Sequence, residues 1–122
     1  MFILFIDDDP DDVQIFSEAV RETFPNAVCG ALYSCDGIAQ AMQQLPVPDY
    51  IFVDSYMFPI GGKECLLKLK AETNPEMTKI FMYSGSMTES ERRSFLELGA
   101  AGTLIKGATY EEIRGTLLRV IG

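Results

Sequence analysis

Residues 2–10 read FILFIDDDP, a short apolar run that stops at three consecutive acidic residues and a proline. A continuous apolar run of this length is typical of a strand that is buried on both faces, as the strands of a parallel sheet are. Pro10 and the acids around it favour the first turn of a helix, where proline fits and negative charge meets the positive end of the helix dipole. The stretch therefore predicts a buried strand over 2–6 and a helix over about 10–24.

The same change from a short apolar run to a longer amphipathic segment recurs four more times along the chain. We expect further strands over 28–33, 50–53, 79–83 and 103–105. We expect further helices between Asp36, taken as the N-cap, and Pro46, between Gly62 and Asn74, and over about 89–98 and 110–121. This alternation predicts the α/β class, as a (βα)5 flavodoxin-like, doubly wound, five-stranded parallel sheet of order 2-1-3-4-5.

Length and composition predict one globular domain. The chain has 122 residues, of which 48 % are hydrophobic and 23 % charged, so a packed core is feasible and an added output domain is not expected. The formal charge of −8 disfavours binding to nucleic acid or to anionic membranes. No apolar run approaches the roughly 18 residues of a membrane span, and no leader is evident, so we expect a cytoplasmic protein, with residues 1–122 as its single domain.

The cysteines give no sign of a metal site. Cys29, Cys35 and Cys65 are odd in number, lack paired metal spacing, and occur in a chain without histidine. A zinc or haem site is therefore poorly supported, and we expect all three to be reduced thiols.

Acidic side chains gather where such a sheet binds its ligands. Open α/β sheets bind ligands beyond the carboxyl ends of the strands at the topological switch point, which here lies between the first and third strands. Asp7, Asp8 and Asp9 follow the first strand, and Asp54 follows the third. Because these carboxylates would repel one another, their convergence invites a hard divalent cation, and Mg²⁺ suits oxygen ligands.

A hydroxyl and a cation complete this group. Ser84 and Lys106 end the fourth and fifth strands, so the topology directs both towards the same crevice. Alone, each is more often an ordinary loop or surface residue, and an acidic triplet is often a solvated turn. Together with Asp54 they supply the parts for phosphoryl transfer through an acyl phosphate: a carboxylate nucleophile, a metal ion, a lysine and a hydroxyl.

These residues resemble the receiver domains of two-component response regulators, in particular the chemotaxis receivers, over essentially the whole chain. The family has an acidic pair after strand one, a phosphoacceptor aspartate after strand three, a serine or threonine after strand four and a lysine after strand five. The matching residues here are Asp7 and Asp8, Asp54, Ser84, and Lys106. The resemblance implies Mg²⁺ held by Asp7, Asp8, Asp54 and the backbone carbonyl of Tyr56, with Ser84 and Lys106 assisting phosphorylation of Asp54.

The resemblance also implies a function. A stand-alone receiver takes its phosphoryl group from a histidine kinase or a histidine phosphotransfer protein and signals by contact with a protein target, here unknown. It is not a classical enzyme, since at most it phosphorylates itself from a phosphodonor and then dephosphorylates itself. Asp9 is expected either to support the metal ligands or to cap the first helix, and not to bind metal directly, and Asp11 and Asp12 are expected to be solvated.

Three positions depart from the family pattern and keep a second function open. Phe58 separates Met57 from Pro59, Gly107 follows Lys106 where proline is usual, and Thr103 replaces the usual aromatic switch residue. The alternative is a receiver-fold adaptor that acts without phosphorylation.

A small flavodoxin-like electron carrier is a third reading of the chain. It would need a phosphate-binding loop rich in serine, threonine and glycine after the first strand, and the acids there would repel that phosphate. We therefore assign the following aromatic residues to the core rather than to a flavin pocket: Tyr33, Tyr50, Phe81 and Phe95.

Overall fold

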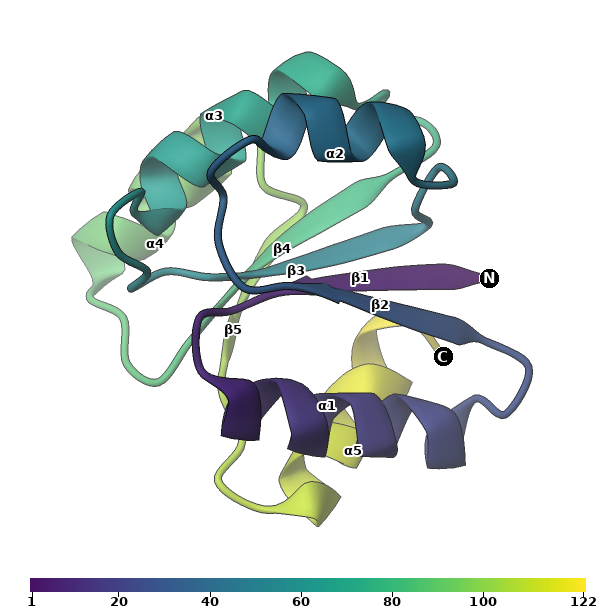
Figure 1. Ribbon diagram of the computed structural model, residues 1–122. Coiled ribbons are helices and arrows are strands. Elements are labelled where there is room, and N and C mark those ends of the chain that lie inside the picture. The colour runs from purple at the N-terminus through teal and green to yellow at the C-terminus, as the bar shows by residue number, and fades with distance from the viewer.

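The computed structural model describes all residues from Met1 to Gly122. Strands and helices alternate along the whole chain, as predicted (Figure 1). Their bounds are β1 Phe2–Ile6, α1 Pro10–Thr23, β2 Val28–Leu32, α2 Ile38–Gln44, β3 Tyr50–Asp54, α3 Gly62–Glu72, β4 Lys79–Ser84, α4 Glu89–Glu97, β5 Gly102–Ile105 and α5 Tyr110–Val120. The strands form one parallel sheet in the predicted order, β2-β1-β3-β4-β5. None of the helices is both long and apolar enough to span a bilayer.

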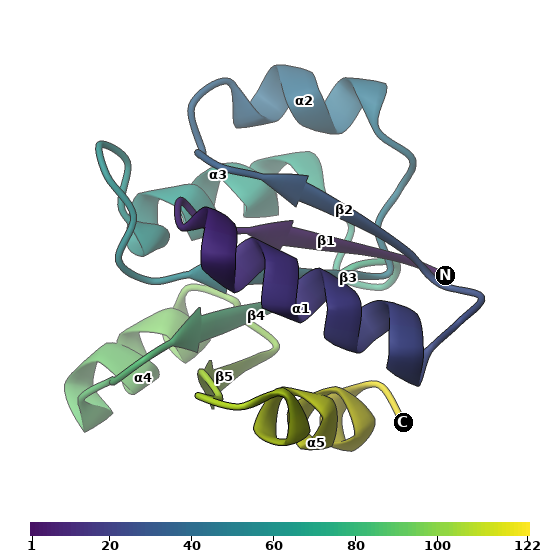
Figure 2. The same ribbon diagram turned by 60° about the horizontal axis from the view of Figure 1, so that its bottom comes forward.

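The sheet is the middle of three layers. Helices α1 and α5 cover one face, and α2, α3 and α4 cover the other (Figures 1 and 2). Because side chains alternate along a strand, β1 sends Ile3 and Phe5 to the first face and Leu4 and Ile6 to the second, and all four are buried. The fully apolar segment over 2–6 thus serves two cores at once, which explains its lack of polar alternation.

Local signals set most helix ends. Asp9 accepts a hydrogen bond from the Asp11 amide at the start of α1, which is one of the two roles predicted for it. The predicted cap of α2 was wrong, because Gly37 takes the N-cap position at a φ of 67° and no side chain caps this helix. A left-handed residue of this kind favours glycine, which explains why the chain turns here and not at Asp36.

Three of the four aromatic residues predicted for the core pack in or against it, and the fourth is exposed. Phe81 and Phe95 are buried and Tyr50 packs against the core at its edge, as predicted. Tyr33 is 54 % exposed, so its assignment to the core was wrong. The reason is that edge strand β2 ends at Leu32, one residue earlier than predicted, and Tyr33 begins the loop.

The cysteines contain the main departure from the predictions. Cys35 and Cys65 form a disulfide with their Cα atoms 5.7 Å apart, within the usual range of about 4.4–6.8 Å. The bond ties the loop after β2 to α3, and both residues lie in the core. The prediction of reduced thiols is therefore wrong for this pair and holds for Cys29, which is free. The partners stand 30 residues apart in sequence and meet only because α2 and α3 cover the same face of the sheet.

Candidate functional site

The sheet brings together the acidic residues that follow β1 and β3. These strands are neighbours, with Ile6 opposite Val53, so the residue after each lies at the same edge of the sheet. The loops that follow β1, β3 and β4 all leave from this side in Figure 1. Asp7 and Asp54 therefore stand side by side because of strand order alone.

Three carboxylates form a compact oxygen cluster. Asp7, Asp8 and Asp54 each offer an oxygen, and these atoms lie within 4.8 Å of one another. Asp7 is fully buried and Asp54 is 6 % exposed, whereas Asp8 faces solvent. Asp9 caps the N-terminus of α1 with its side chain and does not belong to the cluster. Such a set of hard oxygen ligands, two of them fixed by burial, suits Mg²⁺ or Mn²⁺.

Lys106 is the cation of this site. Its Nζ lies 2.7 Å from Asp7 Oδ2, 2.9 Å from Asp12 Oδ2 and 3.5 Å from Asp54 Oδ1. Asp12 was predicted to be solvated, which is wrong, because this half-exposed carboxylate pairs with Lys106; Asp11 is exposed, as predicted. One ammonium group thus balances part of the charge of three carboxylates from two separate segments.

Burial and charge act in opposite directions on the central pair. Burial raises the pKa of Asp7, and the hydrogen bonds from Lys106 and from the Asp9 amide lower it only in part, so the net pKa is above its ordinary value. Burial lowers the pKa of Lys106, but its hydrogen bonds to Asp7 and Asp12 and the charge of Asp54 more than reverse this, and its pKa is raised. Lys106 is therefore firmly cationic, and Asp7 carries an ionised carboxylate at a cost in free energy.

Ser84 lies at the end of β4, beside β3, but its hydroxyl is engaged elsewhere. The side chain is buried, and Oγ donates to the carbonyl of Ser86 at 2.6 Å. The Ser84 carbonyl accepts a hydrogen bond from the Lys106 amide at 2.7 Å, which joins the ends of β4 and β5. The structure thus brings the Ser84 backbone to the same edge as the acids and Lys106, while its hydroxyl is hydrogen-bonded within the loop that follows β4.

The loop after β3 holds Tyr56 close to Asp54. The Tyr56 amide donates to Asp54 Oδ1 at 3.2 Å, and the Tyr56 hydroxyl donates to Glu91 Oε2 at 3.0 Å. Met57 is buried and Phe58 is 84 % exposed, so the extra residue before Pro59 projects into solvent. Glu91 was not predicted as a site residue.

Two glycines permit close backbone packing around the site. A Cβ on Gly62 would lie 2.7 Å from Ser55 Cα, so only glycine lets α3 start against the loop that follows Asp54. A Cβ on Gly107 would lie 2.7 Å from Glu112 Cβ and 2.9 Å from Ile113 N. Gly107, which stands where the family usually has proline, therefore lets the backbone after Lys106 pack closely against α5.

The sequence carried a faint signal for Asp12 and none for Glu91. Asp12 lies in the first turn of α1, which begins directly after the acidic run of Asp7, Asp8 and Asp9. Glu91 reaches the site only through a contact between α4 and the loop after β3, two segments that the sequence pattern does not pair.

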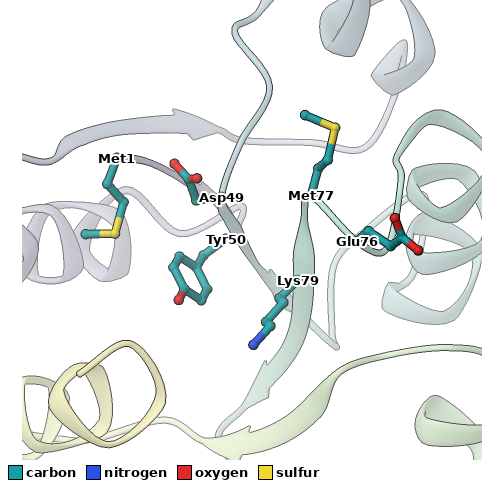
Figure 3. Close-up of a pocket in the computed structure, with 6 residues that line it drawn as sticks. All are labelled: Met1, Asp49, Tyr50, Glu76, Met77 and Lys79. Carbon is teal, nitrogen blue, oxygen red and sulfur yellow. The ribbon is translucent and has the colours of Figure 1, made fainter.

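A separate hollow lies at the opposite edge of the sheet (Figure 3). It measures about 390 Å³ and is lined by residues at the starts of β1, β3 and β4: Met1, Asp49, Tyr50, Glu76, Met77 and Lys79. Its charged side chains are exposed, and Asp49 already accepts a hydrogen bond from the Phe2 amide at 2.8 Å. None of the predicted site residues lies there.

The comparisons with known proteins point to one family. Residues 3–118 match the family model described as response regulator receiver domain. Among solved structures, the chain is similar to chemotaxis protein CheY4 of Vibrio cholerae, with 21 % identity, a TM-score of 0.83 and coverage of 98 % of this chain and 97 % of that one.

Two further solved structures agree in fold. The signal receiver domain of the DNA-binding response regulator merR from Colwellia psychrerythraea 34H matches with 18 % identity, a TM-score of 0.82 and coverage of 99 % and 98 %. The Mn²⁺-bound form of response regulator Rcp1 matches with 20 % identity, a TM-score of 0.80 and coverage of 95 % and 91 %. At these identities the structures show a shared fold, and the family match rests on the sequence model.

Proposed function

The chain belongs to the response regulator receiver domain family of two-component signalling, and on that premise we propose that it accepts a phosphoryl group on Asp54. The donor is a histidine kinase or a histidine phosphotransfer protein. The observation that carries this proposal is the meeting of Asp7, Asp8, Asp54 and Lys106 at the carboxyl edge of the sheet. This is the arrangement that phosphoryl transfer to a carboxylate needs.

The chemistry uses few groups. A carboxylate oxygen of Asp54 attacks phosphorus, the bond from phosphorus to the donor's nitrogen breaks, and the histidine nitrogen keeps that electron pair. Lys106, 3.5 Å from Asp54 Oδ1, neutralises charge on the transferred phosphoryl oxygens. Ser84 donates its hydroxyl to one of these oxygens once it has left the Ser86 carbonyl. No general base is needed, because an ionised carboxylate is already a nucleophile.

The oxygen cluster fits a resident Mg²⁺. Carboxylate oxygens of Asp7, Asp8 and Asp54 would hold it together with the backbone carbonyl of Tyr56. When bound, the ion supplies further positive charge for the phosphoryl oxygens. That a receiver of the same fold was solved with Mn²⁺ supports an ion of this type. Asp7 gains most from it, because its burial leaves an ionised carboxylate that Lys106 satisfies only in part.

Signal output is proposed to pass by protein contact. The acyl phosphate is later hydrolysed at the same site, so the protein acts as a timed switch and not as a classical enzyme. The formal charge of −8 argues against direct binding of nucleic acid or of an anionic membrane surface. We propose that the protein meets these donors in the cytoplasm. We treat residues 1–122 as one receiver domain.

Specific observations favour the phosphorylation-independent adaptor as a second candidate. The Ser84 hydroxyl is held by Ser86, and Thr103 offers no aromatic ring for the family's usual readout. An adaptor would keep its surface contacts whatever the state of Asp54.

The test is intact mass spectrometry after incubation with acetyl phosphate, with Mg²⁺ and with a chelator. We expect a gain of one phosphoryl group that needs Mg²⁺ and vanishes in Asp54→Asn. Asp36→Asn is the matched control, since Asp36 is an exposed aspartate outside the cluster, and it should gain mass as the wild type does. No gain in the wild type would favour the adaptor.

A further inference from the structure

The loop after β3 and the start of α4 are joined by one side-chain contact. The Tyr56 hydroxyl donates to Glu91 Oε2 at 3.0 Å, although the residues stand 35 positions apart in sequence. Tyr56 is 58 % exposed, so burial does not fix its ring, and the hydrogen bond is what holds it. The contact crosses from the loop that carries the phosphoacceptor to a helix on the surface.

Glu91 uses its other oxygen to hold the start of α4. Glu91 Oε1 accepts from the Thr88 amide at 3.1 Å, and the Glu91 amide donates to Thr88 Oγ1 at 3.1 Å. This reciprocal pair is a capping box, which fixes the first turn of the helix. One carboxylate thus binds both Tyr56 and the last residue before α4.

Tyr56 is tied to the phosphoacceptor at its backbone end. Its amide donates to Asp54 Oδ1 at 3.2 Å, on the same carboxylate that is proposed to take the phosphoryl group. Direct contacts therefore run from Asp54 through Tyr56 and Glu91 to Thr88, without a gap. A change of charge and size on the Asp54 carboxylate acts on the first of these contacts.

The segment from Ser84 to Thr88 closes the path from the other side. The Ser84 hydroxyl is bound to the Ser86 carbonyl at 2.6 Å, so it must leave that partner before it can donate to a phosphoryl oxygen on Asp54. Such a change alters the loop at 85–87, whose far end at Thr88 is held by Glu91. The contact between Tyr56 and Glu91 therefore restrains the loop that has to move.

We propose that the hydrogen bond between Tyr56 and Glu91 is a latch that holds the 84–88 loop in its unphosphorylated arrangement, and that phosphorylation opens it and frees the start of α4. This inference rests on the proposed phosphorylation of Asp54. Glu91 is a positioning residue, because it acts on the site through Tyr56 and Thr88. Because coupling is reciprocal at equilibrium, a weaker latch raises the fraction of the unphosphorylated protein in the arrangement that phosphorylation favours, and the phosphorylation rate rises with that fraction.

The test compares phosphorylation rates in acetyl phosphate and Mg²⁺ for variants of the two latch residues. Tyr56→Phe removes only the hydroxyl and leaves the capping box intact. Glu91→Ala removes the acceptor, and Glu91→Gln keeps an oxygen for Thr88 and an amide that can donate to the Tyr56 hydroxyl oxygen. Glu97→Ala is the matched control, since Glu97 is an exposed acid at the far end of α4.

A net hydrogen bond at an exposed site corresponds to about a two- to fivefold change in an equilibrium. We expect Tyr56→Phe and Glu91→Ala to raise the phosphorylation rate by about this factor. The double variant should match Glu91→Ala, which already lacks the acceptor for the Tyr56 hydroxyl, Glu91→Gln should return close to the wild-type rate, and Glu97→Ala should leave it unchanged. Unchanged or slower rates in both single variants, or a double variant whose effect is the product of the two, would overturn the latch.

A second readout keeps the latch separate from the proposed function. Amide hydrogen exchange in the unphosphorylated protein should become faster over residues 84–92 in Tyr56→Phe, and unchanged exchange there would contradict the latch. If exchange over residues 84–92 is faster in Tyr56→Phe than in the wild type, but the wild type gains no phosphoryl mass, the contact restrains the loop while the proposed function, and with it the regulatory role, is wrong. If the wild type gains the phosphoryl mass but the variants show the same amide exchange and phosphorylation rates as the wild type, only the latch is wrong.

Discussion

Replacement of Lys106 by methionine tests the electrostatic account of the site. The Lys106 side chain is 17 % exposed and its Nζ lies 2.7 Å from the fully buried carboxylate of Asp7. Methionine keeps an apolar stem of similar shape but removes the cation. In the metal-free protein, the change leaves Asp7 as a buried carboxylate without its ion-pair partner.

The expected loss follows from the burial of the two partners. Breaking a buried ion pair by removing one partner costs about 3–5 kcal/mol, and the partial exposure of Lys106 places this case near the lower end, at about 3 kcal/mol. In an Asp7→Asn background only Asp12 and Asp54 lose a partner, so the same substitution should cost about 1 kcal/mol. The two backgrounds should therefore differ by about 2 kcal/mol.

The loss should also depend on pH with a definite sign. Burial already raises the pKa of Asp7, and removal of Lys106 takes away a group that lowers it. A carboxyl whose folded pKa is raised favours the folded state below its unfolded pKa and loses that contribution as pH rises through the folded pKa. The cost of Lys106→Met should thus be small near the ordinary pKa of 3.8 and reach its full size at neutral pH.

Urea denaturation of the four proteins of this cycle, in chelator and at several pH values, measures these free energies. Equal costs of Lys106→Met in the two backgrounds, or a cost that does not change with pH, would refute the assignment of Asp7 as the buried partner.

Three further changes test other parts of the structure. Asp8→Asn removes one carboxylate from the cluster, so it should stabilise the metal-free protein by up to about 1 kcal/mol and reduce its stabilisation by Mg²⁺; the opposite signs in thermal unfolding would argue against a metal cluster. Cys35→Ala, or addition of reductant to the wild type, should lower the free energy of unfolding by about 3–4 kcal/mol because the bond closes a loop of 30 residues. Cys35→Ala should then not respond to reductant, whereas Cys29→Ala keeps the bond and should respond as the wild type does; equal stability of the wild type with and without reductant would mean that the bond is absent in solution. Gly107→Ala should destabilise the protein, since the new Cβ would meet the backbone of Ile113 at 2.9 Å, and a neutral result in the same denaturation assay would show that this loop can yield.

The fold was predictable because its strands are apolar throughout and its helices amphipathic. Residues 2–6 and 50–53 lie in β1 and β3, two of the three interior strands, where both faces are covered, and their runs carry no charged residue. The prediction weakened at the edge, where β2 is half-buried and its end at Leu32 left Tyr33 in a loop. Burial on both faces leaves a clear sequence pattern, and burial on one edge does not.

The site was predictable only to the level of strand ends. Topology alone places Asp7, Asp54 and Lys106 at one edge, because parallel strands in this order end together. The partnership of Lys106 with Asp12 and that of Tyr56 with Glu91 depend on side-chain geometry, which no spacing rule contains. The pairing of Cys35 with Cys65 was missed for the same reason, since it depends on how the loop after β2 packs against α3.

The central claim is that Asp54 carries the phosphoryl group, and reductive trapping tests it at residue level. The protein is incubated with acetyl phosphate and Mg²⁺, treated with borohydride, which reduces an aspartyl phosphate to homoserine, and mapped by peptide mass spectrometry. We expect homoserine at position 54 alone, and none when Mg²⁺ is chelated. Homoserine at Asp8 or at another carboxylate, or none under any condition, would contradict it.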